Sequence, residues 1–137
     1  MKDLKKKIRA IMTKHVISVD MQDTIEKVEH ILNSHKLSSV PVIDSARRSD
    51  LNECFGIISL RDLAHFHESK KNPTAVRAWE ICTYKPIQVS PDLIVSDAAQ
   101  IMVTNGVHHL VITENKSIKG FVSSLDLIKE YLIQERT

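Results

Sequence analysis

A repeat divides this chain into two halves, and no other feature of the sequence restricts its fold as strongly. Residues 11–44 align with residues 81–114 at an offset of 70, and residues 56–63 align with residues 120–127 at an offset of 64. Few aligned positions are identical, but the apolar spacing of both copies indicates the order strand, helix, strand, strand, helix. The sequence therefore predicts two copies of one folding unit.

The two copies differ in length at one place and are separated by a polar stretch. The first copy has six extra residues within 45–53, which explains the change of offset (70 − 64 = 6). Residues 68–74 are polar and contain Pro73, which favours a linker. We therefore expect a first motif with an N-terminal helix over residues 1–67, a linker over 68–74 and a second motif over 75–137.

Each motif is too small to form a stable core alone, because a chain of about 60 residues buries too little apolar surface. The motifs should therefore pack on each other. Since helices recur between the strands, the expected class is mixed α+β, with two three-stranded sheets packed face to face. Ile8 and Ile11 have helical spacing, which predicts the N-terminal helix, and Trp79 is expected in the core.

Charge and thiol content exclude several classes of function. The formal net charge is +2, but residues 1–10 carry five basic residues and one acidic residue, so the rest of the chain sums to −2. A nucleic-acid-binding domain would show a basic face, so no nucleic-acid partner is expected. Cys54 and Cys82 lack zinc-ligand spacing, so we expect free thiols and no metal site. The sequence has neither a membrane-length apolar run nor a secretory signal, which predicts a cytoplasmic protein without membrane insertion.

The string Gly-x-x-Ser-x-x-Asp-Leu occurs in both copies where the last strand meets the last helix. In one interpretation, Ser59 and Ser123 are helix N-caps. Asp62 and Asp126, three residues later, then return the hydrogen bond. In the other, the free amides and positive dipole end of the helix attract a phosphate, and the carboxylate accepts from both vicinal hydroxyls of a ribose. The second interpretation requires a ligand with a ribose and an apolar base.

These strings are the most specific part of a resemblance to the cystathionine-β-synthase (CBS) motif. Residues 40–44 and 106–112 also resemble strings of that family, and the likeness covers nearly the whole chain as a tandem pair, or Bateman module. The resemblance implies two β-α-β-β-α repeats with pseudo-twofold symmetry and two clefts. It also implies a homodimeric regulator that needs no cofactor and binds AMP, ADP or ATP, or less commonly S-adenosylmethionine or NAD.

The same resemblance assigns ligand contacts residue by residue. Asp62 and Asp126 would hold the ribose hydroxyls. Ser59 and Ser123 would contact ribose or phosphate, and Arg61 would bind a phosphate, whereas the second copy has no cation in that place. Further contacts to the base or the phosphates would come from Thr13, Val16, Ile17, Thr83, Pro86, Ile87, His108 and His109. Because neighbouring residues alternate across a strand, only one of the two histidines can face a given cleft.

The expected function is a nucleotide-binding regulatory module, an energy or metabolite sensor. It would signal to an unknown effector protein through a ligand-dependent change of repeat or dimer geometry. One alternative is an interaction or assembly module with empty clefts, in which Ser59 and Asp62 only cap a helix. Another is a metal-assisted hydrolase built on the histidines. Phosphate-binding loops and catalytic motifs such as His-Glu-x-x-His are absent from the sequence, so no enzyme is expected.

Overall fold

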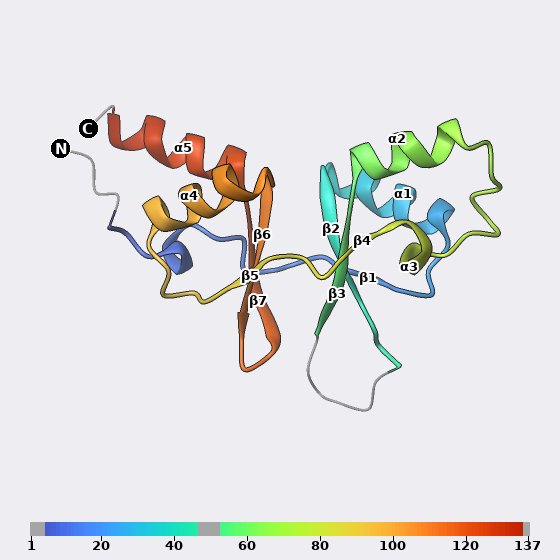
Figure 1. Ribbon diagram of the computed structural model, residues 1–137, viewed down its shortest axis with the longest axis horizontal. Helices are drawn as coiled ribbons and strands as arrows, with labels where there is room; N and C mark the ends of the chain where they lie inside the picture. Colours follow the sequence, from blue (N-terminus) through green and yellow to red (C-terminus); the bar gives the residue numbers. More distant parts are fainter. Residues whose placement is uncertain (1–4, 47–52, 136–137) are drawn as a thin grey trace. The chain divides into compact units, whose positions relative to one another are not determined.

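Figure 1 presents the computed structural model, which describes residues 5–46 and 53–135. The chain forms two compact units. The first unit is Ile17–Pro86, and the second unit combines the residues up to Val16 with the residues from Ile87 on. Each unit has one sheet and its own helices, which confirms the mixed α+β class.

The first unit is built on a sheet of four strands. It consists of β1 (Val19–Asp20), α1 (Ile25–His35), β2 (Ser39–Ile43), β3 (Cys54–Ser59), α2 (Leu60–Glu68), α3 (Ala78–Ile81) and β4 (Thr83–Tyr84). The strand order is β1-β2-β3-β4; β1 is parallel to β2, and the other neighbours are antiparallel. Helices α1 and α2 cover one face of the sheet (Figure 1). Most of the insertion of the first copy, residues 47–52, lies outside the described residues.

The second unit repeats this plan with a sheet of three strands. It consists of the 3-10 turn η1 (Ile8–Ala10), β5 (Gln88–Val89), α4 (Val95–Asn105), β6 (His109–Glu114), β7 (Ser117–Ser123) and α5 (Ser124–Glu135). β5 is parallel to β6, and β6 is antiparallel to β7. Helices α4 and α5 lie on one face of this sheet (Figure 1). Across the described residues, no helix combines the length and the apolar character of a membrane span.

The equivalent helices α1 and α4 form where apolar residues recur every three or four positions. In α1 this spacing puts Ile25, Val28 and Leu32 in the core of the first unit, at most 1% exposed. Both helices end at a residue in the left-handed conformation, Lys36 after α1 and Gly106 after α4. Glycine adopts this conformation without strain, and the 3.6-residue period of the apolar side chains ends there in both copies.

The N-terminal segment packs on the second repeat. Ile8 is fully buried in the core of the second unit. Its N–H donates to Leu93 O at 2.7 Å, and the Arg9 N–H donates to Pro91 O at 3.1 Å. Further along, Thr13 and Phe121 exchange two backbone hydrogen bonds of 2.9 and 3.1 Å. The residues that precede the first repeat therefore complete the second unit.

The segment before the second repeat makes the equivalent contacts in the first unit. The Ala78 N–H donates to Asp23 O at 2.8 Å, and the equivalent Ile8 N–H donates to Leu93 O in the second unit. Thr83 in β4 pairs with Ile57 in β3, as Thr13 pairs with β7. The two repeats thus exchange their leading segments within one chain.

The structure differs from the sequence-based expectations at three places. The first sheet has four strands and not three, because residues 83–84 pair along its edge. The N-terminal helix is only a 3-10 turn, because the backbone of residues 6–9 hydrogen-bonds to residues 91–95. Trp79 was expected in the core but is 47% exposed, and its N–H donates to Met21 O.

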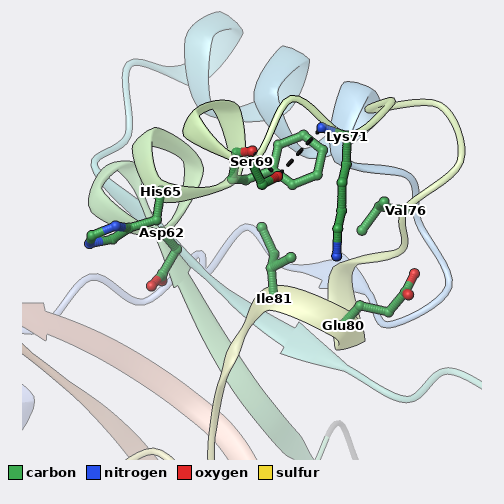
Figure 2. A pocket seen from close by; sticks show the side chains of 8 residues that line it. Asp62, His65, Ser69, Lys71, Val76, Glu80 and Ile81 are labelled. Atoms are coloured by element: carbon green, nitrogen blue, oxygen red, sulfur yellow. Dashed lines mark hydrogen bonds between the residues drawn. The ribbon is translucent and has the colours of Figure 1, made fainter.

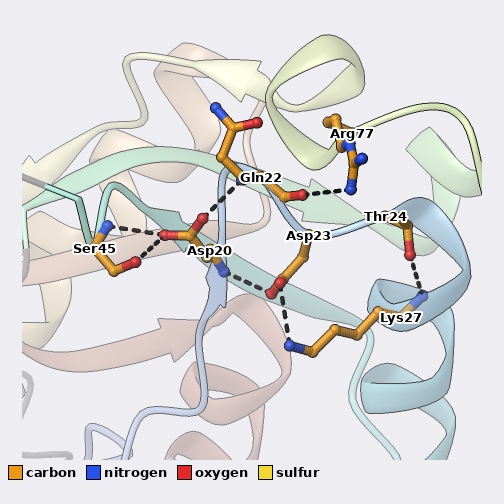
Figure 3. A network of polar contacts seen from close by, with 7 residues as sticks. All are labelled: Asp20, Gln22, Asp23, Thr24, Lys27, Ser45 and Arg77. Carbon is orange, nitrogen blue, oxygen red and sulfur yellow. Dashed lines mark hydrogen bonds and ion pairs between the residues drawn. The ribbon is translucent and has the colours of Figure 1, made fainter.

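A polar network fixes the turn between β1 and α1 in the first unit (Figure 3). The Asp20 carboxylate accepts hydrogen bonds from the N–H and hydroxyl of Ser45 and from the Gln22 N–H. Burial by itself would raise the pKa of Asp20, but these hydrogen bonds and the charge of Lys27 outweigh it and hold the pKa below its usual value. Asp23 accepts from the Asp20 N–H and pairs with Lys27, so the turn is held on both sides.

Candidate functional site

The N-terminus of α2 carries the first predicted site. Ser59 is the N-cap, and Asp62 is the third residue of the helix. Asp62 Oδ2 accepts hydrogen bonds from the Ser59 N–H at 2.8 Å and from the Ser59 hydroxyl at 3.1 Å. In return, the Asp62 N–H donates to Ser59 Oγ at 3.2 Å. This capping box uses one carboxylate oxygen only, which leaves Oδ1 to accept hydrogen bonds from a ligand.

The N-terminus of α5 carries the second predicted site in the same geometry. The Ser123 N–H donates to Asp126 Oδ2 at 2.8 Å, and the Asp126 N–H donates to Ser123 Oγ at 3.2 Å. Both side chains are half-buried. The capping interpretation is therefore confirmed in both units. It is compatible with ligand binding, because each helix start still presents backbone amides and the positive end of the dipole.

In the second unit, strand register brings four side chains to one face of the sheet. His109 lies opposite Ser123 on the neighbouring antiparallel strand, and Thr13 pairs with Phe121, two residues before Ser123. Paired residues, and residues two apart on a strand, project to the same face. The N-terminal segment thus places Thr13 beside the capped end of α5, on the face opposite the buried Val122.

The first unit gathers the equivalent residues in the same way. Ser39 lies opposite Ser59, and Thr83 lies opposite Ile57, two residues earlier. Ser39 is 5% exposed, and its hydroxyl has no hydrogen-bond partner in the part of the chain that the structure describes. A buried hydroxyl without a partner costs about 1–3 kcal/mol, so this position is suited to a ligand atom that can bond to it.

His109 is the basic side chain of the second set. Its ring stacks on Phe121, with the centroids 5.3 Å apart and the planes 15° from parallel. Burial lowers the pKa of His109, the nearby charge of His108 lowers it further, and Asp126 opposes the shift. The imidazole is therefore neutral at pH 7 and offers one donor and one acceptor nitrogen.

Arg61 and His108 are the remaining predicted phosphate contacts. Arg61 is exposed on the first turn of α2, and its counterpart Leu125 is 55% exposed on α5. His108 is exposed while His109 is half-buried, in agreement with alternation along a strand. The Ser124 N–H donates to the backbone carbonyl of His108 at 2.8 Å, so this residue supports the start of α5 through its main chain.

The predicted base contacts are divided between the units. Val16 belongs to the unit of Thr13, and Pro86 belongs to the unit of Thr83. Ile17 belongs to the unit of Thr83, and Ile87 belongs to the unit of Thr13, where it packs against the core. The structure therefore brings each threonine together with the serine and aspartate of the other repeat, which the alignment of the copies does not indicate.

Phe121 belongs to the second set and is missing from the sequence-based assignment. The alignment of the copies pairs it with Ile57 of the first repeat and gives it no ligand contact. The alternation of side chains along a strand could have found it, because a residue two positions before Ser123 must share its face. The stacked imidazole could not have been inferred, because it depends on the register between β6 and β7.

Metal and thiol chemistry find no support in the described residues. These residues include no group of three His, Cys, Asp or Glu side chains that could hold a metal ion. Cys54 and Cys82 are free thiols, as expected. Burial raises the pKa of Cys54 to about 12 and also raises the pKa of Cys82, so both stay protonated and weakly nucleophilic at neutral pH.

Comparison of the sequence with known proteins identifies both repeats. The family profile described as CBS domain matches residues 8–68 and 78–133. The chain is also similar to an uncharacterized 17.7 kDa protein in the bps2 3′ region of Acidianus ambivalens. The two are 32% identical over 127 residues, which cover 92% of this chain and 73% of that protein.

Solved structures share the fold over nearly the whole chain. One is the CBS domain pair of protein MJ0100 in complex with 5′-methylthioadenosine and S-adenosyl-L-methionine, with a TM-score of 0.82 and 21% identity. The match covers 96% of this chain and 98% of that one. Another is CBSX2 in complex with AMP, with a TM-score of 0.80, 18% identity, and coverage of 96% and 99%.

Proposed function

The chain belongs to the CBS-domain family, and from this premise we propose that it is a regulatory module that binds an adenosine nucleotide and signals to an effector protein. The observation that carries the proposal is the matched set in each unit. A threonine, a serine and an aspartate meet beside a helix N-terminus, and they come from both repeats. A ligand held by such a set contacts the leading segment of one repeat and the capped helix of the other.

The chemistry of each set suits a nucleoside phosphate. Asp62 uses Oδ2 for the helix cap, which leaves Oδ1 to accept from the ribose hydroxyls, and Asp126 is placed in the same way. The helix amides and the hydroxyl of the capping serine would face a phosphate. Arg61 in the first unit adds a cation at the solvent edge. Thr13 with Val16, and Thr83 with Pro86, would contact the base.

The ligands bound by two structural neighbours support this class. The CBS domain pair of MJ0100 binds 5′-methylthioadenosine and S-adenosyl-L-methionine, and CBSX2 binds AMP. Adenosine is common to all three molecules. We propose AMP, ADP or ATP for this chain, because helix N-termini and Arg61 favour phosphate groups. S-adenosylmethionine and NAD are the second choice.

Signalling would follow from differential binding. A ligand that prefers one arrangement of the repeats shifts the population toward it, and an effector protein that contacts the module senses that shift. A ligand with equal affinity for both arrangements would signal nothing. The module would act as a regulator and not as a catalyst.

A homodimer is the assembly that we propose, with α5 as its contact helix. Five large apolar side chains of this helix are exposed by 47–60%: Leu125, Ile128, Tyr131, Leu132 and Ile133. The exposed face of the equivalent helix α2 is polar apart from Leu60 and the small Ala64. A contiguous apolar face marks an interaction surface. A Leu132→Glu variant should convert the dimer to a monomer in light scattering, whereas an Ala64→Glu variant on α2 should not.

The rival function is an interaction or assembly module without a nucleotide ligand. The observation in its favour is that both serine–aspartate pairs cap helices, so their presence needs no ligand to explain it. The two functions differ in what an aspartate-to-asparagine change does. Asparagine keeps an acceptor for the cap but loses the charge and the second acceptor oxygen.

Calorimetric titration of the full chain with AMP, ADP, ATP, S-adenosylmethionine and NAD tests the proposal. At least one of these compounds should bind, and Asp62→Asn or Asp126→Asn should weaken that binding by about 10–150-fold. The matched control is Asp97→Asn, which alters the third residue of α4 outside both sets. Absence of binding by all five compounds, or equal affinity in all three variants, would establish the assembly module.

A further inference from the structure

A pocket of about 320 Å³ opens in the first unit between α2 and α3 (Figure 2). Its lining comes from α2, from the segment that follows α2 and from α3, all of which lie within the first unit. This volume is at the lower end of the roughly 300–1,000 Å³ that is usual for small-molecule sites. The pocket therefore has room for a small metabolite, and it shares Asp62 with the serine–aspartate pair at the start of α2.

The inner wall of the pocket is apolar and held in place by the core. Phe66 is only 5% exposed and belongs to the core of the first unit. Val76 and Ile81 are half-buried and pack against the same core. These three side chains line the pocket together. They offer a fixed apolar surface to the body of a ligand, since core side chains do not move aside at low cost.

The outer wall carries opposite charges that do not neutralise each other. Lys71 makes no ion pair among the residues that the structure describes, and Figure 2 shows its ammonium end turned toward the side of Glu80 and Ile81. Glu80 uses Oε2 to accept the Arg77 N–H at 2.7 Å, which leaves Oε1 available. Its carboxylate is therefore present in the pocket as an acceptor for a cationic group.

Three other polar side chains line the pocket, those of Ser69, Asp62 and His65. The Ser69 hydroxyl donates to Phe66 O, and it accepts the Lys71 N–H at 3.4 Å. Asp62 uses Oδ2 in the cap of α2 and keeps Oδ1, and His65 has its Nδ1 3.8 Å from Glu68 Oε2. Figure 2 shows Asp62 and His65 on the side of the pocket away from Lys71 and Glu80. Beside the apolar wall, the polar contacts to a ligand therefore come from Lys71 and Glu80.

We propose that this pocket binds a small zwitterion with an apolar body, of the α-amino-acid class. Its carboxylate pairs with Lys71, its ammonium pairs with Glu80, and its side chain lies against Phe66, Val76 and Ile81. The lining carries two carboxylates and one ammonium, so a simple anion meets net repulsion, and a simple cation leaves Lys71 without a partner. Only a ligand that carries both charges satisfies both partners, and the apolar wall favours an aliphatic side chain.

The proposal is tested by NMR of the full chain with methyl-labelled Val76 and Ile81. L-Leucine is the probe, and isoamylamine and 4-methylpentanoate each lack one of its charges. L-Leucine should shift both methyl signals, and each single-charge analogue should bind about tenfold more weakly or worse. Lys71→Met and Glu80→Gln should each weaken leucine binding by a similar factor. Glutamine keeps an acceptor for the Arg77 N–H, so α3 stays capped.

The matched control is Lys70→Met, because Lys70 is the exposed neighbour of Lys71 and does not line the pocket. Its affinity for leucine should equal that of the unmodified chain. Absence of methyl shifts at millimolar leucine overturns the proposal, as do equal affinities for leucine and isoamylamine or equal losses in Lys70→Met and Lys71→Met. AMP titrated into the same sample separates the two proposals, since AMP binding without leucine binding overturns only this one.

Discussion

The two units place different side chains at the same point of the same backbone. Ser39 opens β2 opposite Ser59, and His109 opens β6 opposite Ser123. Ser39 is a buried hydroxyl that lacks a partner within the described ranges, whereas His109 is a half-buried ring stacked on Phe121. The exchanged leading segments fix the geometry of both sets, and the side chains that occupy this geometry decide the chemistry of each one.

The largest expected effect on stability comes from shortening the buried side chain by which the N-terminal segment packs into the second unit. Ile8→Ala should destabilise the second unit by about 2–5 kcal/mol, because a fully buried side chain is lost and a cavity remains. Hydrogen exchange measured by mass spectrometry should then rise in α4 and β6. If hydrogen exchange rose instead in α1 and β2, the N-terminal segment would pack on its own repeat. The account in which the repeats swap their leading segments would then be wrong.

A smaller difference is expected between the two matched glycines. A Cβ at Gly56 would lie 2.7 Å from the backbone oxygen of Thr83, which cannot retreat without shifting β4. The three heavy atoms nearest to a Cβ at Gly120 would all belong to the side chain of Met12, which is flexible. Gly56→Ala should therefore cost about 1–3 kcal/mol in denaturant titrations, and Gly120→Ala should cost less. Equal losses would contradict the different packing of the two units.

The turns before α1 and α4 should respond differently to acid. The pKa of Asp20 is lower in the folded state than in the unfolded state. Its contribution to folding stability is therefore complete above the unfolded-state pKa and is lost as pH falls through the folded-state pKa. Asp20→Asn should lower stability by about 1 kcal/mol at pH 7 and flatten the decline below about pH 4. The equivalent turn relies on an exposed ion pair of Arg9 with Asp92. Asp92→Asn should have a smaller effect that 1 M salt abolishes.

The smallest effect should appear in the pH dependence of ligand binding. The folded-state pKa of His109 is lowered, so the neutral ring contributes stability above the unfolded value of about 6.5, and this contribution is lost as pH falls toward the folded value. Protonation would add a positive charge beside the second set, so AMP affinity there should rise a few-fold as pH falls through the lowered pKa of His109. His109→Asn should remove this rise. A rise that survives the substitution would place the titrating group elsewhere.

Much of this architecture follows from the sequence. The packing of each leading segment on the other repeat does not. The apolar periods of α1 and α4 and the position of β2 are local patterns, and they appear where the sequence predicts them. The capped helix starts at Ser59 and Ser123 are equally local. The pairing of Thr13 with Phe121 connects residues more than 100 positions apart, and no spacing in one sequence encodes it. The exposure of Trp79 has the same origin, because tertiary pairing fixes the backbone around it.

A double-mutant cycle on AMP binding tests most directly that each site is assembled from both repeats. Thr13→Val and Asp126→Asn should be coupled by about 0.5 kcal/mol or more, because both residues belong to the set of the second unit. Thr13→Val combined with Asp62→Asn should be additive within about 0.5 kcal/mol, because those residues belong to different sets. Coupling of Thr13 to Asp62 and not to Asp126 would contradict the account.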